Sequence, residues 1–354
     1  MTAKTRYFVI TSLLVMTAGV GTGLVAYYVG FPAHAIAGPG GPAELKYVPR
    51  DATVVAYADV NAVMGSELRQ HVKSAFPAAD AAQNGQREFE SETGINIETD
   101  IDRVVFSLDA NAAGDGSSAV LVLANGRFDE VKIESLMREH GATVEQYKGK
   151  RIIVATPPAP SGDTPAVGAG SPDGRGPNVR KVGDFAVSFL KPGLAAVGSV
   201  KLIRTAADLE NGGESVTTND TVMNLVRSMD SGNAWAVGRL DALREKAQLP
   251  NGMNQLPAIT WFSASGHVNS GIDGVVRAEA RDDESANSLR EVIRGFIALG
   301  RLQAGAKPEL QAMLQSLELG GAGRTVALSF SVPANAIDSL VPTDTNKRPR
   351  PRAR

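Results

Sequence analysis

Residues 101–124, IDRVVFSLDANAAGDGSSAVLVLA, contain two groups of strand-forming residues with a polar loop between them. β-Branched, aromatic and aliphatic side chains are concentrated at Ile101–Asp109 and at Ser118–Ala124, which predicts two strands of a sheet. The loop between them is rich in Gly, Ala, Asp and Ser, and several of these residues favour turns. We take this pair of strands as the centre of a first structural unit.

Elements on either side of the pair complete a β-α-β-β-α-β order. Asp129 is predicted to cap a helix, because Ile133, Leu136, Met137 and His140 follow at helical spacing and Gly141 ends it. The other predicted elements are strand Thr53–Val60, helices Val63–Phe76 and Ala78–Glu92, and strands Thr143–Tyr147 and Arg151–Ala155, which pair across a Lys148-Gly149 turn. This order is that of a split β-α-β, or ferredoxin-like, unit.

A second run of elements repeats this order loosely. It consists of strand Ala234–Arg239, helix Asp241–Ala247, hairpin strands Ile259–Val268 and Ile272–Ala280, a long helix with Leu289, Val292, Ile293, Phe296 and Leu299 on one face, and strand Arg324–Val332. Between the runs, Phe185–Leu190 and Leu194–Gly198 form a hairpin across Lys191-Pro192-Gly193, followed by a helix over Lys201–Leu209. The sequence does not assign this hairpin to either sheet. The expected fold class is α+β, with an N-terminal transmembrane helix followed by two ferredoxin-like units with mixed or antiparallel sheets.

The N-terminus predicts the transmembrane helix. Residues 7–31 carry no charged side chain, and Lys4 and Arg6 precede them. At about 1.5 Å per residue, such a helix spans the roughly 30 Å core of a bilayer. Positive charge on the N-terminal side predicts a single-pass protein of the inner membrane, with a cytoplasmic N-terminus and an extracytoplasmic, periplasmic globular region. A cleaved signal peptide is the alternative, because Ala33-His34-Ala35 offers a small-x-small cleavage pattern.

Composition divides the rest of the chain into segments. The expected segments are the cytoplasmic N-terminus and transmembrane helix (1–31), a tether (32–46), the first unit (47–155), a disordered Pro/Gly-rich insertion (156–180), a connecting hairpin and helices (181–230), the second unit (231–341) and a disordered basic tail (342–354).

Charge and cysteine content limit the possible partners. Without Lys4, Arg6 and the five basic residues of the last eight positions, 29 basic residues stand against 38 acidic ones, a net charge of −9. A region this acidic is not expected to bind nucleic acid. The expected partners are the lipid bilayer, through the N-terminal helix, and an envelope protein or an anionic surface polymer. If the basic tail 342–354 binds no such partner, it serves as a solubilising segment. The oligomeric state stays open. The absence of cysteine excludes disulfides and thiol chemistry.

Motif searches give partial matches to catalytic sites. Ser188-Phe189-Leu190-Lys191 matches the S-x-x-K pattern of penicillin-interacting enzymes, and Ser231-Gly232-Asn233 resembles their second motif. However, no K-T-G follows, and Ser188 is predicted in a strand rather than at the start of a helix. We therefore expect a hairpin and no catalytic residue here.

Metal and cofactor patterns are also incomplete. The segment from Asp109 begins like a calcium loop but has Ala113 and Val120 where ligands are needed. Glu98, Asp100 and Asp102 alternate at a strand start, which is typical of a solvated edge or, alternatively, of a cation site. The histidines, His34, His71, His140 and His267, show no metal-ligand spacing, and Ser265 near His267 has no evident carboxylate partner. Trp235 and Trp261 are expected in the core, with a ligand platform as the alternative. No catalytic, cofactor or metal residue is predicted.

Five segments cover most of Tyr47–Leu209, namely YVPRDATVVAYADVNAVMGSEL, ETGINIETDIDRVVFSLD, LANGRFDEVKIESLMREHG, YKGKRIIVA and LAAVGSVKLIRTA. Together they resemble an uncharacterised family of bacterial membrane-anchored exported proteins. The resemblance implies export and a regular fold, and it implies no activity.

The leading functional hypothesis is a non-enzymatic binding or structural module of the cell envelope. The alternative is an envelope hydrolase whose site is assembled only in three dimensions. A pocket with convergent ionisable groups favours the hydrolase, and an exposed apolar surface favours a binding partner.

Overall fold

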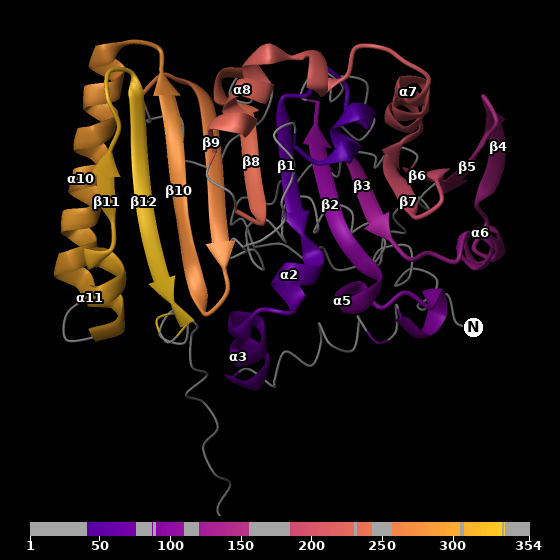
Figure 1. The fold of residues 1–354 in the computed structure, drawn as a ribbon, viewed down its shortest axis with the longest axis horizontal. Helices are drawn as coiled ribbons and strands as arrows, with labels where there is room; N and C mark the ends of the chain where they lie inside the picture. Colours follow the sequence, from indigo (N-terminus) through magenta and orange to yellow (C-terminus); the bar gives the residue numbers. More distant parts are fainter. Residues whose placement is uncertain are drawn as a thin grey trace, which may run out of the picture.

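The computed structural model describes residues 41–75, 87, 90–109, 120–155, 185–229, 232–242, 257–304, 308–334 and 336 of the chain. These residues form one 12-stranded sheet in the order β11-β12-β10-β9-β8-β1-β2-β3-β7-β6-β5-β4 (Figure 1). Every neighbouring pair of strands in this order is antiparallel.

The strands are β1 (Val54–Asp59), β2 (Ile101–Leu108), β3 (Val120–Gly126), β4 (Thr143–Tyr147), β5 (Lys150–Ala155), β6 (Phe185–Lys191), β7 (Leu194–Ser199), β8 (Ala234–Arg239), β9 (Ile259–Val268), β10 (Gly271–Ala280), β11 (Glu318–Gly320) and β12 (Thr325–Pro333). The helices are η2 (Ala43–Tyr47), α2 (Val60–Met64), α3 (Glu67–Ala75), α5 (Ile97–Asp100), α6 (Glu130–Glu139), α7 (Val200–Glu210), η4 (Val216–Thr218), α8 (Asp220–Ser228), α10 (Asp283–Ala304) and α11 (Pro308–Gln315).

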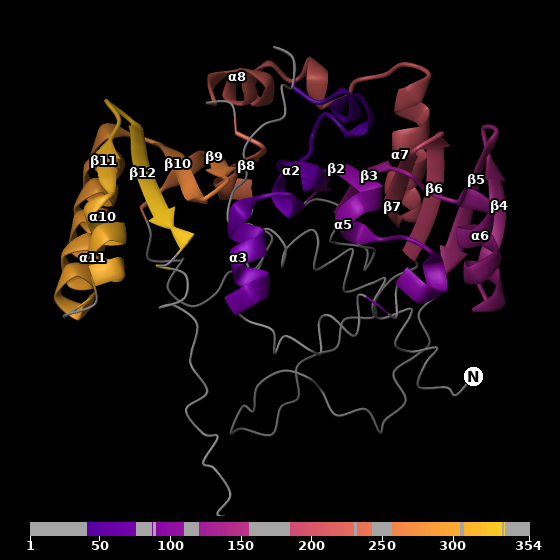
Figure 2. The same ribbon diagram turned by 60° about the horizontal axis from the view of Figure 1, so that its bottom comes forward.

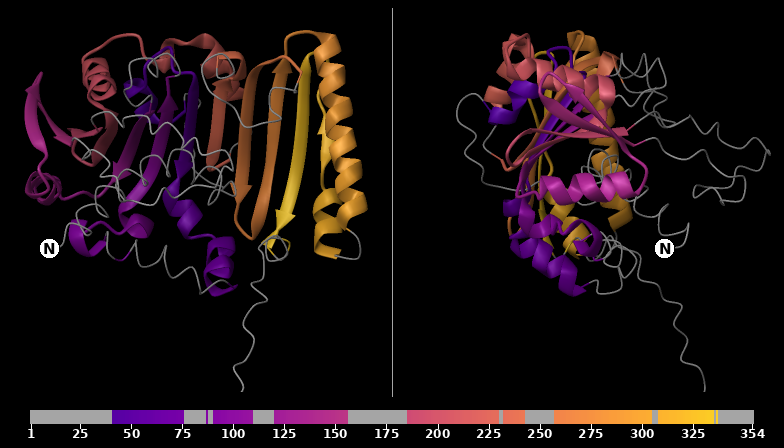
Figure 3. Two further views of the ribbon diagram at one scale, coloured as in Figure 1. Left: turned by 180° about the vertical axis from the view of Figure 1, so that it is seen from behind. Right: turned by 90° about the vertical axis from the view of Figure 1, so that its right-hand side faces the viewer.

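Both faces of the sheet carry apolar side chains, because successive residues of a strand point to opposite sides. One face includes Tyr57 and packs against α7, α8 and η2 in the largest core cluster. The opposite face includes Ala56 and Ile153, and it packs against α6 at one end and α10 at the other. Figures 2 and 3 show these helices at the two ends and on the two sides of the long sheet.

The predicted fold class is wrong. In a ferredoxin-like unit, a helix crosses one face of the sheet and joins two parallel strands that flank a third. Here the strands before and after the first helical segment pair directly and antiparallel, with Asp59 opposite Arg103. Helices α2, α3 and α5 therefore lie beyond the ends of the central strands β1 and β2 instead of crossing a face of the sheet (Figure 1). The described chain forms one large antiparallel sheet in place of two separate units.

The two runs of elements occupy the two halves of this sheet. The order β8-β9-β10-β12-β11 matches β1-β2-β3-β5-β4, except that the hairpin β6–β7 lies between β3 and β5. The halves meet where β1 pairs with β8. β11, which follows α11, was not predicted.

Several expected segments lie outside the described residues, namely the N-terminal apolar segment, most of helix Ala78–Glu92, the insertion 156–180 and the tail 342–354. Within the described ranges, none of the helices combines the length and hydropathy needed to cross a membrane. The expected tether 32–46 extended too far, since Glu44 and Leu45 of η2 are buried in the globular region. The core therefore begins before residue 47.

Candidate functional site

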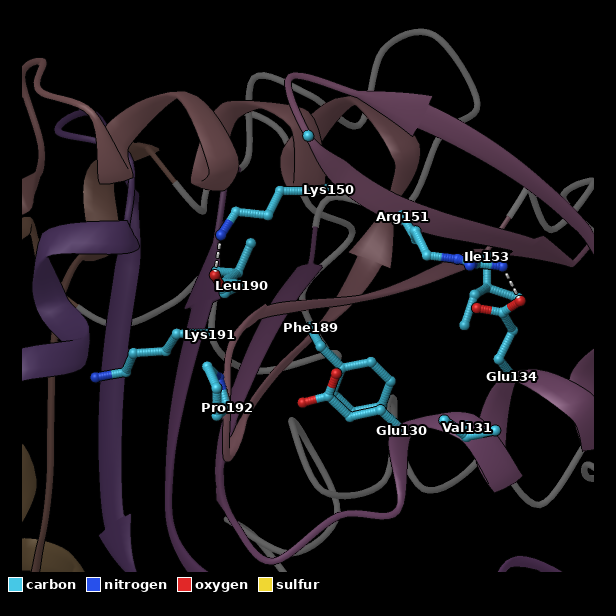
Figure 4. A pocket seen from close by; sticks show the side chains of 11 residues that line it. Glu130, Val131, Glu134, Lys150, Arg151, Ile153, Phe189, Leu190, Lys191 and Pro192 are labelled. Carbon is cyan, nitrogen blue, oxygen red and sulfur yellow. Dashed lines mark hydrogen bonds and ion pairs between the residues drawn. The ribbon is translucent and has the colours of Figure 1, made fainter.

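A surface pocket of about 340 Å³ lies between the start of α6 and the strands β5 and β6 (Figure 4). We call it the α6 pocket. Its apolar lining residues are Val131, Ile153, Phe189, Leu190 and Pro192, and its charged lining residues are Glu130, Glu134, Lys150, Arg151 and Lys191, together with Gly149. The volume is at the lower end of the range for ligand pockets, about 300–1,000 Å³.

The start of α6 is fixed by its N-cap. The Asp129 carboxylate accepts a hydrogen bond from the backbone N–H of Lys132 at 2.9 Å, as an N-cap side chain does. On its inner side, α6 buries Met137 against Ile153 and Val187 of the sheet. These contacts hold the first turn of α6 above β5 and β6. They leave Val131 at the edge of the pocket, with 80% of its surface exposed.

Ion pairs hold three of the charged lining residues, Lys150, Arg151 and Glu134. The Lys150 ammonium lies 2.7 Å from the Glu210 carboxylate and also donates to the carbonyl of Leu190. Arg151 pairs with Glu134 across the gap between β5 and α6 (Figure 4).

The remaining two charged lining residues, Glu130 and Lys191, form no ion pair or side-chain hydrogen bond with the residues that the structure describes. In Figure 4 the Lys191 side chain extends away from Phe189. The arrangement gives an apolar floor with a charged rim.

The S-x-x-K match is not a catalytic site. Ser188 is 0% exposed, and its hydroxyl donates a hydrogen bond to the carbonyl of Arg151 at 2.9 Å. The hydroxyl therefore links β6 to β5. Lys191, the lysine of the S-x-x-K match, is the last residue of β6. In the second partial motif, Asn233 is fully buried and Ser231 lies outside the described residues.

The acidic residues considered as a cation site have separate partners. Glu98 pairs with Arg69 at 2.8 Å, Asp100 lies 3.4 Å from the Arg127 guanidinium, and Asp102 accepts from the Asn61 amide at 2.7 Å. Across the ranges given above, the structure brings together no group of three residues that suits a metal ion. Most of the calcium-like loop after Asp109 lies outside those ranges.

The histidines and tryptophans are dispersed. His140 ends α6, where its Nδ1 lies 2.7 Å from the Leu136 carbonyl. His267 is on β9, His71 is on α3, and His34 is outside the described residues. Trp235 is 6% exposed and stacks on Tyr57, so its expected core position is confirmed. Trp261 is partly buried, with the Arg239 guanidinium 5.9 Å from its ring centroid.

A buried polar cluster beside Tyr57 was not predicted. Glu44 of η2 is 2% exposed, and one of its carboxylate oxygens accepts a hydrogen bond from Arg103 at 3.1 Å, while the other has no hydrogen-bond partner among the residues that the structure describes. Burial raises the pKa of Tyr57, and the charge of Asp59 adds to the increase. Burial also raises the pKa of Asp59, even though this carboxylate accepts a hydrogen bond from Ala62 at the start of α2. No local pattern in the sequence indicates this cluster, because its members come from η2, β1 and β2.

Helix α10 buries only part of the apolar face that its helical spacing predicts. Leu289 is buried against the sheet, whereas Phe296, Leu299 and Leu302 are 67%, 50% and 81% exposed. This exposed surface is separate from the α6 pocket, at the opposite end of the sheet.

Comparisons with known proteins give little further information. No protein-family model matches the chain, and no curated protein matches it. A solved structure of crystal form I of TP0453 aligns with a TM-score of 0.43 and 9% sequence identity, over 84% of this chain and 96% of that one. Similarity at this level supports no inference about function. The resemblance to an uncharacterised exported family therefore stays a prediction.

Proposed function

We propose that this chain is a non-enzymatic binding module of the cell envelope that recognises an apolar side chain of a partner envelope protein in the α6 pocket. The observation that carries this proposal is the combination of an apolar floor with a charged rim. An apolar anchor that enters a pocket, surrounded by polar groups, is the usual arrangement of an interface centre.

The position of Val131 supports a macromolecular partner. An aliphatic side chain that is 80% exposed beside a pocket adds apolar surface outside the cavity itself. Phe128 precedes the N-cap of α6, its ring centroid lies 6.2 Å from that of the pocket residue Phe189, and both side chains are partly exposed. A peptide segment can cover such a surface while one of its side chains enters the pocket.

The hydrolase alternative has less support from the same residues. The charges of Lys150, Arg151 and Glu134 are engaged in ion pairs, and the nearby hydroxyl of Ser188 is buried and hydrogen-bonded to backbone. A nucleophile needs an accessible side chain next to a general base.

For localisation, we propose that the globular region lies outside the cytoplasm and is attached to the inner membrane by residues 7–31. This proposal rests on the uncharged stretch and on Lys4 and Arg6 before it.

Affinity capture from native membranes after chemical crosslinking tests the proposed function. Val131→Glu places a charge at the mouth of the pocket and suits the first turn of a helix, so folding is expected to be unaffected. The matched control is Ser135→Glu, which adds the same charge at an exposed position of α6 outside the pocket. We expect an envelope protein to be captured by the wild type and by the control, and to be lost with Val131→Glu. Equal capture by all three proteins would contradict the role of the pocket.

A further inference from the structure

The outer surface of α10 between Val292 and Leu302 is apolar. The exposed fractions are 37% for Val292, 67% for Phe296, 50% for Leu299 and 81% for Leu302. At 100° per residue these side chains lie on one side of the helix, where Gly295 and Ala298 are exposed as well. We call this the α10 outer surface.

The opposite side of α10 already has its partner. Ala286 and Leu289 are buried, and Ile293 packs beside them against Ala278, Phe262 and Val326. The sheet therefore fixes the helix in place, and the α10 outer surface is held toward solvent.

The charge on this part of α10 is positive. From Glu291 to Ala304 the charged residues are Glu291, Arg294 and Arg301, which give a net charge of +1, and the exposed Glu291 lies on the same side of the helix as Gly295 and Ala298. The two arginines are seven positions apart, so both lie at one border of the α10 outer surface, next to Ala298. Arg294 makes no ion pair with the residues that the structure describes, and Arg301 donates a long hydrogen bond of 3.4 Å to the Leu314 carbonyl. Both arginines are exposed, so their guanidinium groups can pair with anions beside this border of the helix.

The size of the surface argues against a stable protein interface. Four partly exposed large side chains present roughly 400 Å² of apolar area, and a pair of such surfaces buries about 800 Å². A specific, stable interface buries about 1,200–2,000 Å². A lipid surface needs no complementary shape, and an apolar helix face with basic residues beside it suits the boundary between headgroups and acyl chains.

A membrane lies within reach under the proposed attachment. Residues 32–42 separate the N-terminal apolar segment from η2, and a fully extended chain of this length spans at most about 40 Å. Attachment at one point raises the effective concentration of a second contact.

We infer that the α10 outer surface docks on an anionic lipid membrane, with Phe296, Leu299 and Leu302 at the headgroup boundary and Arg294 and Arg301 at lipid phosphates. The inference rests on the proposed membrane attachment and is independent of the α6 pocket.

A fluorescent label tests this docking in the full chain. Because the chain has no cysteine, Leu302→Cys and Glu214→Cys each provide one labelling site. Glu214 is a matched control, since its side chain is 74% exposed near η4. Each protein is labelled with an environment-sensitive dye and reconstituted into vesicles of phosphatidylethanolamine and phosphatidylglycerol that contain a lipid with a spin label near the headgroup.

We expect the dye at position 302, but not at position 214, to shift to shorter wavelength and to be quenched by the spin-labelled lipid. The substitution pair Phe296→Ser and Leu299→Ser in the Leu302→Cys protein is expected to abolish both effects while the protein stays in the vesicle fraction. Absence of quenching at position 302 in vesicle-bound protein overturns the docking alone. Crosslinking of two position-302 cysteines in a parallel unlabelled sample, without quenching in the labelled one, overturns it in favour of a second copy. Recovery of the full chain from the aqueous fraction overturns both docking and attachment.

Discussion

Tyr57 of β1 and Trp235 of β8 lie directly opposite each other, and their rings stack with centroids 5.8 Å apart and an angle of 25° between the ring planes. This contact joins the two halves of the sheet at the only strand pair that links them in the described order, β1 with β8. Both rings are nearly fully buried. The two halves are therefore expected to unfold as one unit.

Trp235→Ala is predicted to destabilise the whole sheet, because removing a buried aromatic ring costs about 3–5 kcal/mol. Urea denaturation followed by circular dichroism and by the fluorescence of Trp261 measures the change. Phe296→Ala is the control, since Phe296 is 67% exposed and should alter the free energy of unfolding by less than about 1 kcal/mol. Two separate transitions in the wild type would show that the halves fold independently.

Arg103→Met is predicted to cost about 1–3 kcal/mol, because it leaves the buried carboxylate of Glu44 without its hydrogen-bonded cation. The side chain of Glu44 is 2% exposed and that of Arg103 is 45% exposed. Adding Glu44→Gln to Arg103→Met should recover much of the loss in a denaturation experiment. Arg50→Met removes a pair with Glu214 that is exposed on both sides, and it should cost less than about 1 kcal/mol. Equal losses for the two arginine variants would contradict the importance of burial.

Asp59→Asn is predicted to stabilise the protein near neutral pH. Burial raises the pKa of Asp59 in the folded state, so the folded protein binds this proton more tightly than the unfolded chain does. The ionised carboxylate therefore lowers the free energy of unfolding at every pH above the folded-state pKa of Asp59. This effect fades as the pH falls toward about 4, the pKa of aspartate in an unfolded chain. Asparagine can keep the hydrogen bond to the Ala62 N–H, because it is an equally good N-cap.

Calorimetry across this pH range checks the sign. The melting temperature of Asp59→Asn should exceed that of the wild type near neutral pH, and the difference should disappear in acid. A difference that grows in acid would mean that Asp59 stabilises the fold through its charge.

The sequence predicted most of the strands but not how they pair. Alternation of apolar residues and turn dipeptides such as Lys148-Gly149 are local, and the hairpin β4–β5 follows from them directly. The pairing of β1 with β8 joins residues that are far apart in the chain, as in Tyr57 and Trp235. Pairing at this separation has no local signal, so the repeated order suggested two sheets where there is one.

The α6 pocket could not be predicted from the sequence for the same reason. Val131, Arg151 and Phe189 come from three elements and form no motif. On α10, helical spacing placed both Leu289 and Phe296 on one apolar face, but it could not show that Leu289 is buried and Phe296 exposed. That distinction depends on where the helix lies relative to the sheet.

The proposed localisation predicts that a reporter active only outside the cytoplasm works when fused after Val341. Lys4 and Arg6 should keep the N-terminus inside, since positive residues resist translocation. Lys4→Glu with Arg6→Glu is expected to reduce the exported fraction. Activity restricted to a cytoplasmic reporter at the same position would contradict export.

Photo-crosslinking in living cells tests the central claim most directly, because it reports contact at the α6 pocket itself. A photoreactive amino acid replaces Val131, and the same amino acid at Ser135 on α6 serves as the control. We predict that illumination links position 131, but not position 135, to one envelope protein, and that Phe189→Ser weakens this adduct while the protein remains folded. No adduct at position 131, or the same adduct at both positions, would contradict a binding module that acts through this pocket.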